Sequence, residues 1–78
     1  MKYKLVKIKW VDSMFGTSEW KDLKDVDTKV PFIYSVGFII KETKKAIIIA
    51  QSIYHTNKHI SQDFLIPRCS IVKINKLK

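Results

Sequence analysis

Three side chains that can bind metals recur at intervals of four: His55, His59 and Asp63. On a helix this spacing would put the two imidazoles on one side and outline a zinc site. The residues around them are polar and stand between two apolar runs, which predicts a turn between strands. A structural zinc site would also need several cysteines, and the chain has one. We therefore predict no metal and no cofactor.

Cys69 is the single cysteine, and either histidine could in principle serve as its base. No oxyanion loop or activating motif accompanies it, so we expect a small buried hydrophobic side chain beside a strand. One cysteine forms no internal disulfide, which favours a reducing compartment. The only glycines, Gly16 and Gly37, are too far apart to form a phosphate-binding loop. The sequence thus indicates a binding protein that is not an enzyme.

Aromatic side chains gather around an irregular segment: Trp10 precedes it, and Phe15 and Trp20 lie within it. An exposed indole there could stack on a nucleic-acid base. In a small domain, however, two such indoles more often pack against each other and cap the core. We favour the core interpretation for both tryptophans and keep ligand contact as the alternative.

The elements that must position these side chains are strands. Residues 3–11 alternate between lysines and apolar residues, which is the period of a half-buried strand. We expect further strands at 32–40, 46–54, 63–66 and 70–75, with 32–40 and 46–54 paired at the centre of the sheet. Residues 67–69 should form the turn before the last strand. Gly37 indicates a bend or a close backbone approach within its strand.

The segment Asp12–Asp27 interrupts this pattern and holds five of the seven acidic residues against two lysines. Basic residues dominate the strands instead, so charge is segregated along the chain. Within the segment, residues 18–23 predict one or two helical turns, with Ser18 as the N-cap and with Trp20 and Leu23 on one face.

Five short strands, a long connection after the first and a tight proline turn before the last are typical of a small all-β domain. We predict a five-stranded SH3-like or Sm-like barrel, with an open oligonucleotide-binding barrel as the alternative. Residues 1–78 form one domain, because a chain of 78 residues has no room for a second core.

Composition narrows the partners. Fifteen Lys and Arg against seven Asp and Glu give a net charge of +8, which attracts nucleic acid, nucleotides or anionic lipid. A chain this short buries only about 60% of its unfolded surface, so a homo-oligomer is expected. No apolar run is long enough for a signal peptide or a membrane span, which predicts no membrane partner and a cytoplasmic protein. Ten lysines in or beside the strands either converge on one surface or disperse as solubilising charge.

Several short motifs occur in order along nearly the whole chain: a W-x-D-S sequence at residues 10–13, a W-x-x-L at 20–23, an S-V-G-F at 35–38, an A-Q-S at 50–52 and an I-P at 66–67. This ordered set resembles a group of small uncharacterised bacteriophage proteins. The resemblance implies a phage origin, a compact β fold and action in the cytoplasm of the host cell. By analogy, some small phage proteins sequester the nucleotide signals of host defence, and a basic β domain suits such a ligand.

The resemblance also selects candidate ligand-binding residues, Trp10, Asp12, Ser13, Trp20, Gln51 and Ser52, to which we add Arg68 for its chemistry. An indole would stack on a base, and Ser13, Gln51 and Ser52 would donate or accept hydrogen bonds. Asp12 would accept from a ribose hydroxyl or an amine, and Arg68 would pair with phosphate. Asp12 and Ser13 have a second interpretation as turn-capping residues.

Three functions follow as hypotheses. The first is a binding module that captures a small anionic nucleotide in a pocket formed at a subunit interface, and so counters host defence. The second is a nucleic-acid-binding small barrel that uses a broad lysine surface. The third is an inhibitor that binds a host protein through the acidic segment or an exposed sheet edge.

Overall fold

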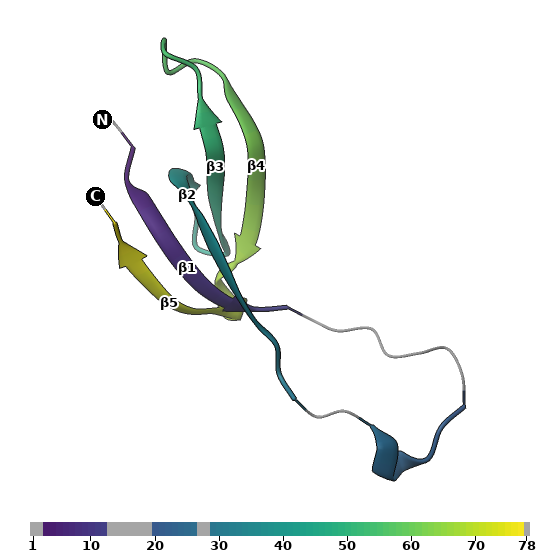
Figure 1. Ribbon diagram of the computed structural model, residues 1–78. Helices are drawn as coiled ribbons and strands as arrows, with labels where there is room; N and C mark the ends of the chain where they lie inside the picture. The colour runs from purple at the N-terminus through teal and green to yellow at the C-terminus, as the bar shows by residue number, and fades with distance from the viewer. Residues whose placement is uncertain (1–2, 13–19, 27–28, 78) are drawn as a thin grey trace.

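The computed structural model describes residues 3–12, 20–26 and 29–77. They form one antiparallel sheet of five strands in the order β4-β3-β2-β1-β5 (Figure 1). The strands are β1 (Leu5–Val11), β2 (Phe32–Glu42), β3 (Ala46–Ile53), β4 (Ile60–Pro67) and β5 (Ile71–Lys76). Two short 3-10 helices complete the described elements, η1 (Leu23–Asp25) and η2 (Arg68–Ser70). The prediction of a mainly β protein with five strands is confirmed, although the sheet is open, with β4 and β5 as its edges.

The hydrophobic core lies on one face of this twisted sheet, which we call the inner face. Alternate residues of β1 point into it, so Val6, Ile8 and Trp10 are buried. Ile47 and Ile49 of β3 join them, and Ile66 is the buried residue of edge strand β4. Ile33, Ile39 and Ile71 pack against this cluster from its margin. The core is therefore small and aliphatic, with a single indole at one end.

Gly37 allows β2 and β3 to approach each other closely. A Cβ atom at this position would lie 3.0 Å from the carbonyl oxygen of Ala50 and 3.2 Å from the Cβ of Ile49. Real Cβ atoms rarely approach backbone this closely, so a side chain here would push the two strands apart. The predicted close backbone approach at Gly37 is confirmed.

The central pairing of β2 with β3 is also confirmed, through Phe38 with Ala50 and Ile39 with Ile49. The fourth strand was predicted too short, because Ile60–Gln62 belongs to β4 and not to the preceding turn. The expected turn at residues 67–69 is the helix η2, one residue later. Asn57, with φ of 62°, lies in the β3–β4 turn, where its backbone N–H donates to the Tyr54 carbonyl at 2.8 Å. Asparagine tolerates this left-handed conformation better than most residues.

Between β1 and β2, the described residues 20–26, which include η1, lie well away from the sheet (Figure 1). This helix begins after Asp22, not after Ser18, and Ser18 lies outside the described residues. Trp20 and Leu23 have exposed fractions of 103% and 91%. The prediction that the Trp20 indole packs with Trp10 to cap the core is therefore wrong, since this segment lies too far from the sheet to reach it.

Candidate functional site

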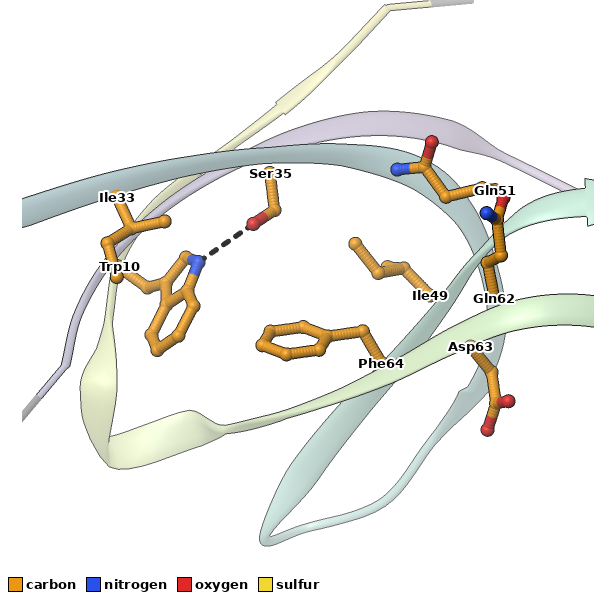
Figure 2. Close-up of a pocket in the computed structure, with 8 residues that line it drawn as sticks. All are labelled: Trp10, Ile33, Ser35, Ile49, Gln51, Gln62, Asp63 and Phe64. Atoms are coloured by element: carbon orange, nitrogen blue, oxygen red, sulfur yellow. Dashed lines mark hydrogen bonds between the residues drawn. The ribbon is translucent and has the colours of Figure 1, made fainter.

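A concave site of about 400 Å³, here called the inner pocket, opens on the inner face of the sheet (Figure 2). Strands β1 to β4 all contribute to its lining. The lining residues are Trp10, Ile33, Ser35, Ile49, Gln51, Gln62, Asp63 and Phe64. This volume lies within the usual range of small-molecule sites, about 300–1,000 Å³.

One end of the inner pocket is apolar and held in place. The Trp10 and Phe64 rings have their centroids 5.4 Å apart at an interplanar angle of 51°. The indole Nε1–H of Trp10 donates to the Ser35 Oγ at 3.0 Å, which fixes the orientation of the indole (Figure 2). Trp10 is only 6% exposed, so its predicted core role is confirmed, whereas Phe64 is 46% exposed. Trp10 thus supports a pocket wall of which Phe64 is the accessible part.

The other end of the inner pocket is polar and carries two amides. Gln51 of β3 and Gln62 of β4 lie there beside each other (Figure 2). The Gln51 Nε2 donates to the Val36 carbonyl at 2.8 Å. The Asp63 carboxylate points away from the rings. Among the lining residues there is no lysine or arginine, so the inner pocket offers no cation to a phosphate group.

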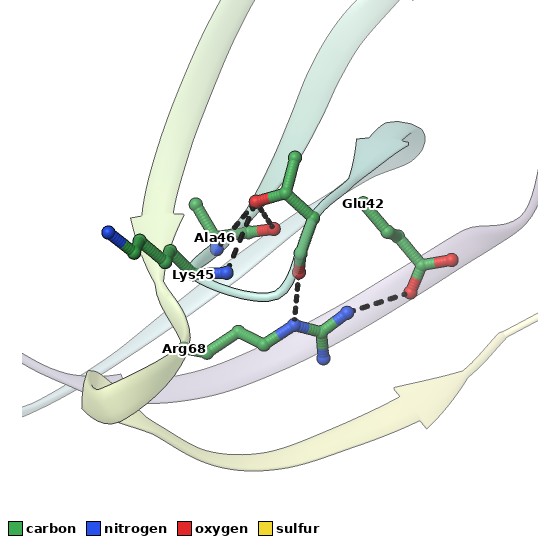
Figure 3. A network of polar contacts seen from close by, with 5 residues as sticks. Glu42, Lys45, Ala46 and Arg68 are labelled. Carbon is green, nitrogen blue, oxygen red and sulfur yellow. Dashed lines mark hydrogen bonds and ion pairs between the residues drawn. The ribbon is translucent and has the colours of Figure 1, made fainter.

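Arg68 lies elsewhere, in η2, and is already engaged. Its Nε donates to the Thr43 carbonyl at 2.7 Å, and its Nη2 is 3.5 Å from the Glu42 carboxylate (Figure 3). The Thr43 hydroxyl in turn accepts from the backbone N–H groups of Ala46 at 3.0 Å and Lys45 at 3.2 Å. Arg68 therefore ties η2 to the β2–β3 turn, and the structure does not bring it to the inner pocket.

The remaining predicted site residues are scattered. Asp12 is exposed beyond the end of β1, and Ser13 lies outside the described residues. Ser52 is exposed on β3 and does not line the inner pocket. Trp20 stands on the projecting segment. Of the six candidates that the structure describes, it brings together only Trp10 and Gln51.

The opposite, outer face of the sheet carries a cluster of side chains that was not predicted from the sequence. Strand pairing puts Lys7 opposite Val36 and Lys9 opposite Tyr34, and Lys9 also faces Lys73 of β5. Directly paired residues share a face, so these side chains stand together. We call this set the lysine–aromatic face: Lys7, Lys9, Phe32, Tyr34, Val36 and Lys73.

The aromatic rings of the lysine–aromatic face are accessible to solvent, and lysine ammonium groups lie close to them. The Lys9 Nζ lies 4.3 Å from the Phe32 ring centroid and 5.9 Å from that of Tyr34. The Lys7 Nζ is also 5.9 Å from the Tyr34 centroid. Phe32 is 52% exposed and Tyr34 60%. Such cation–π contacts at an exposed site are weak, about 0.5–1 kcal/mol, so a ligand can displace them.

The sequence signal for this face was the alternation of residue types along each strand. The sequence showed the lysines of the first strand and the shared side of Tyr34 and Val36, but not the register that aligns the two strands. Register depends on pairing across a long connection, which a single-sequence pattern does not specify.

Other candidate chemistry lies apart from both surfaces. Cys69 is exposed in η2, so the prediction of a buried cysteine is wrong. His55 and His59 place their rings 4.5 Å and 6.3 Å from that of Tyr54 in the β3–β4 turn. Within residues 3–12, 20–26 and 29–77, no three His, Cys, Asp or Glu side chains gather as metal ligands would. Over the same residues, no helix has the length and apolar character to cross a membrane.

Comparison with known proteins does not assign this chain to a family. The chain matches no protein family, no curated protein and no solved structure.

Proposed function

We propose that this chain is a non-enzymatic binding module that holds single-stranded nucleic acid on its lysine–aromatic face. The observation that carries the proposal is the register of β1 and β2, which sets Lys7 and Lys9 against exposed Tyr34 and Phe32 rings. Proteins that bind single strands combine cations for the phosphates with rings on which bases stack.

The charge of this face fits a polyanion. Strands β1 and β5 contain lysines and no acidic residue, and the one carboxylate of β2, Glu42, is at its far end and pairs with Arg68. The net charge of +8 attracts the polyanion over a longer range. Single strands are favoured over duplexes, because exposed rings stack on bases that are free to splay out.

A small anionic nucleotide remains the main alternative ligand from the sequence analysis. The inner pocket, which holds Trp10 and Gln51, has no cation in its lining, so the structure supports this alternative less well than the nucleic acid. The nucleotide is therefore tested as a competitor of the oligonucleotide.

The fold forms part of the proposal. The strand order, the long β1–β2 connection and the 3-10 helix between β4 and β5 support a small SH3-like or Sm-like barrel plan. We also propose that the barrel is completed in a homo-oligomer, because edge strands β4 and β5 expose backbone hydrogen-bonding groups. The resemblance to small phage proteins supports placing this activity in the cytoplasm of an infected host.

Fluorescence anisotropy with a labelled oligodeoxythymidine tests the proposal. The chain offers a matched pair of tyrosines, because Tyr34 and Tyr54 are 60% and 58% exposed. Tyr34→Ala should weaken binding roughly tenfold, since stacking contributes about 1–3 kcal/mol per base. Tyr54→Ala, remote from the lysine–aromatic face, should change the affinity less than about twofold.

Two results would overturn this assignment. In the first, the oligonucleotide does not bind at low salt. In the second, both tyrosine variants weaken it equally. A cyclic dinucleotide that displaces the oligonucleotide at equimolar concentration would favour the nucleotide alternative.

A further inference from the structure

The inner pocket is a second site that the lysine–aromatic face does not use. Neighbouring residues of a strand point to opposite faces, so Trp10 and Ser35 open inward while Lys9 and Tyr34 point outward. A ligand on the outer face therefore leaves the inner pocket unoccupied. What the inner pocket could bind follows from its own side chains.

Its apolar part suits a flat ring. Phe64 is 46% exposed beside a buried Trp10, and Ile33 and Ile49 form the neighbouring wall (Figure 2). Aromatic and aliphatic groups at one end of a concave site bury a planar apolar surface well. Because no lysine or arginine lines the pocket and the Asp63 carboxylate points away from the rings, the ring itself should be uncharged.

The polar part of the inner pocket has hydrogen-bonding capacity left over. The Ser35 hydroxyl accepts from Trp10 and keeps its own proton to donate. Gln51 uses its Nε2 on the Val36 carbonyl, and its Oε1 has no partner among the described residues. The Gln62 amide likewise makes no hydrogen bond to the described part of the chain. One hydroxyl donor and two amides thus line the same pocket as the Trp10 and Phe64 rings.

The backbone at Gln62 departs from strand geometry at this position. Its φ is 57°, although it lies inside β4. Pairing with β3 holds on both sides, through Ala50 with Asp63 and Ser52 with Ser61. A non-glycine residue in this conformation is strained, and such strain gathers at ligand sites. Here the strained residue is the one that brings its amide to the inner pocket.

We propose that the inner pocket binds an uncharged planar heteroaromatic ring of the nucleobase class. The ring packs against Phe64 beside Trp10, and its polar edge meets the Ser35 hydroxyl and the amides of Gln51 and Gln62. The source is either a free nucleoside or a base of a bound strand, and the two share the same chemistry. This site stands independently of the lysine–aromatic face.

The Trp10 indole gives a direct readout, because its Nε1–H donates to the Ser35 hydroxyl that the ring would contact. The chain has two tryptophans, and Trp20→Phe assigns the Trp10 indole N–H signal in an amide-correlation NMR spectrum. Titration with adenosine, guanosine, cytidine and thymidine should shift this signal saturably for at least one nucleoside. If the source is a strand base, an oligonucleotide that contains this base should shift the signal at lower concentration.

Two variants separate recognition from folding. Gln51→Ala should weaken the nucleoside at least fivefold, whereas the matched control Ser52→Ala, next on the same strand and outside the pocket, should leave it unchanged. Gln62→Gly should also weaken the nucleoside while the melting temperature stays the same or rises, because glycine adopts a positive φ without strain.

The inference is overturned if no nucleoside shifts the Trp10 indole signal, or if both Gln51→Ala and Gln62→Gly bind as tightly as the unaltered chain. Failure here leaves oligonucleotide binding by Tyr34 intact, and failure of that binding leaves the nucleoside shift intact. The two proposals are therefore tested separately.

Discussion

The two faces of the β1–β2 pair are built from alternating residues of the same strands and differ in almost every property. The inner face holds Val6 and Ile8 at 2% and 0% exposure. The outer face holds Tyr34 and Phe32 at 60% and 52%, with lysine ammonium groups over their rings. The two faces belong to the same two strands and share one backbone. The difference between them therefore lies in what the side chains of each face contact.

This difference separates the residues whose type is explained by the stability of the fold from those whose type is not. Apolar burial accounts for the inner face, at about 25 cal/mol per Å² of surface removed from water. Burial accounts less well for the outer rings, because Phe32 and Tyr34 keep 52% and 60% of their surface exposed. The exposed outer aromatic residues are therefore consistent with the proposed nucleic-acid contact, whereas buried Val6 and Ile8 of the inner face serve stability.

The largest expected effect comes from breaking the inner face. Ile8→Ala should lower the free energy of unfolding by about 2–5 kcal/mol, through lost burial and the cavity left behind. A domain of this size has only a few kcal/mol of net stability, so most molecules should unfold. Thermal or urea unfolding followed by circular dichroism measures the change.

Val36→Ala is the matched outer-face control, since Val36 is 42% exposed on the neighbouring strand. It should cost less than about 1 kcal/mol. Equal costs for the two substitutions would contradict the account in which the buried inner side chains, and not the exposed outer ones, stabilise the sheet.

A smaller effect on stability is expected at Gly37, where β2 and β3 approach each other closely. Gly37→Ala should cost about 1–3 kcal/mol, because the new methyl group meets the Ala50 carbonyl and forces the strands apart. Urea unfolding gives the cost, and hydrogen exchange at Phe38 should rise because its pairing with Ala50 of β3 loosens. A stability equal to that of the unaltered chain would show that the strands relax freely and that the close approach is not needed.

The smallest of these effects is the hydrogen bond that orients Trp10. A double-mutant cycle of Trp10→Phe and Ser35→Ala removes the indole donor and its hydroxyl acceptor separately and together. The coupling free energy should be about 1 kcal/mol, as for a partly buried neutral hydrogen bond. A coupling near zero would mean that packing against Phe64 alone positions the indole.

Much of the sheet was predictable from the sequence because inner strands alternate clearly. In β1 the buried residues Val6, Ile8 and Trp10 recur at every second position, and the expected strand differs from the observed one only at its start. Edge strand β4 was harder to predict, since all of its residues except Ile66 are exposed. Without a buried face at Ile60–Gln62, the pattern there is that of a polar turn.

The candidate binding surfaces were less predictable, because they depend on strand register and on contacts between residues far apart in the sequence. Gln51 was identified from its motif, but its neighbour Gln62 comes from β4 and carries no sequence signal of its own. Arg68 was expected to be available for phosphate, yet its guanidinium is used at the β2–β3 turn. Trp20 was expected in the core, and its segment instead projects from the sheet.

The salt dependence of oligonucleotide binding in two charge-matched variants tests the central claim most directly. Lys9→Ala and Arg68→Ala each remove one positive charge, but only Lys9 belongs to the lysine–aromatic face. Three lysine contacts predict a log–log salt slope of about −2, at roughly −0.7 per phosphate for single strands. Lys9→Ala should make this slope shallower by about 0.7, and Arg68→Ala should leave it unchanged. Equal changes in both variants would contradict the account, because binding would then follow net charge and not this face.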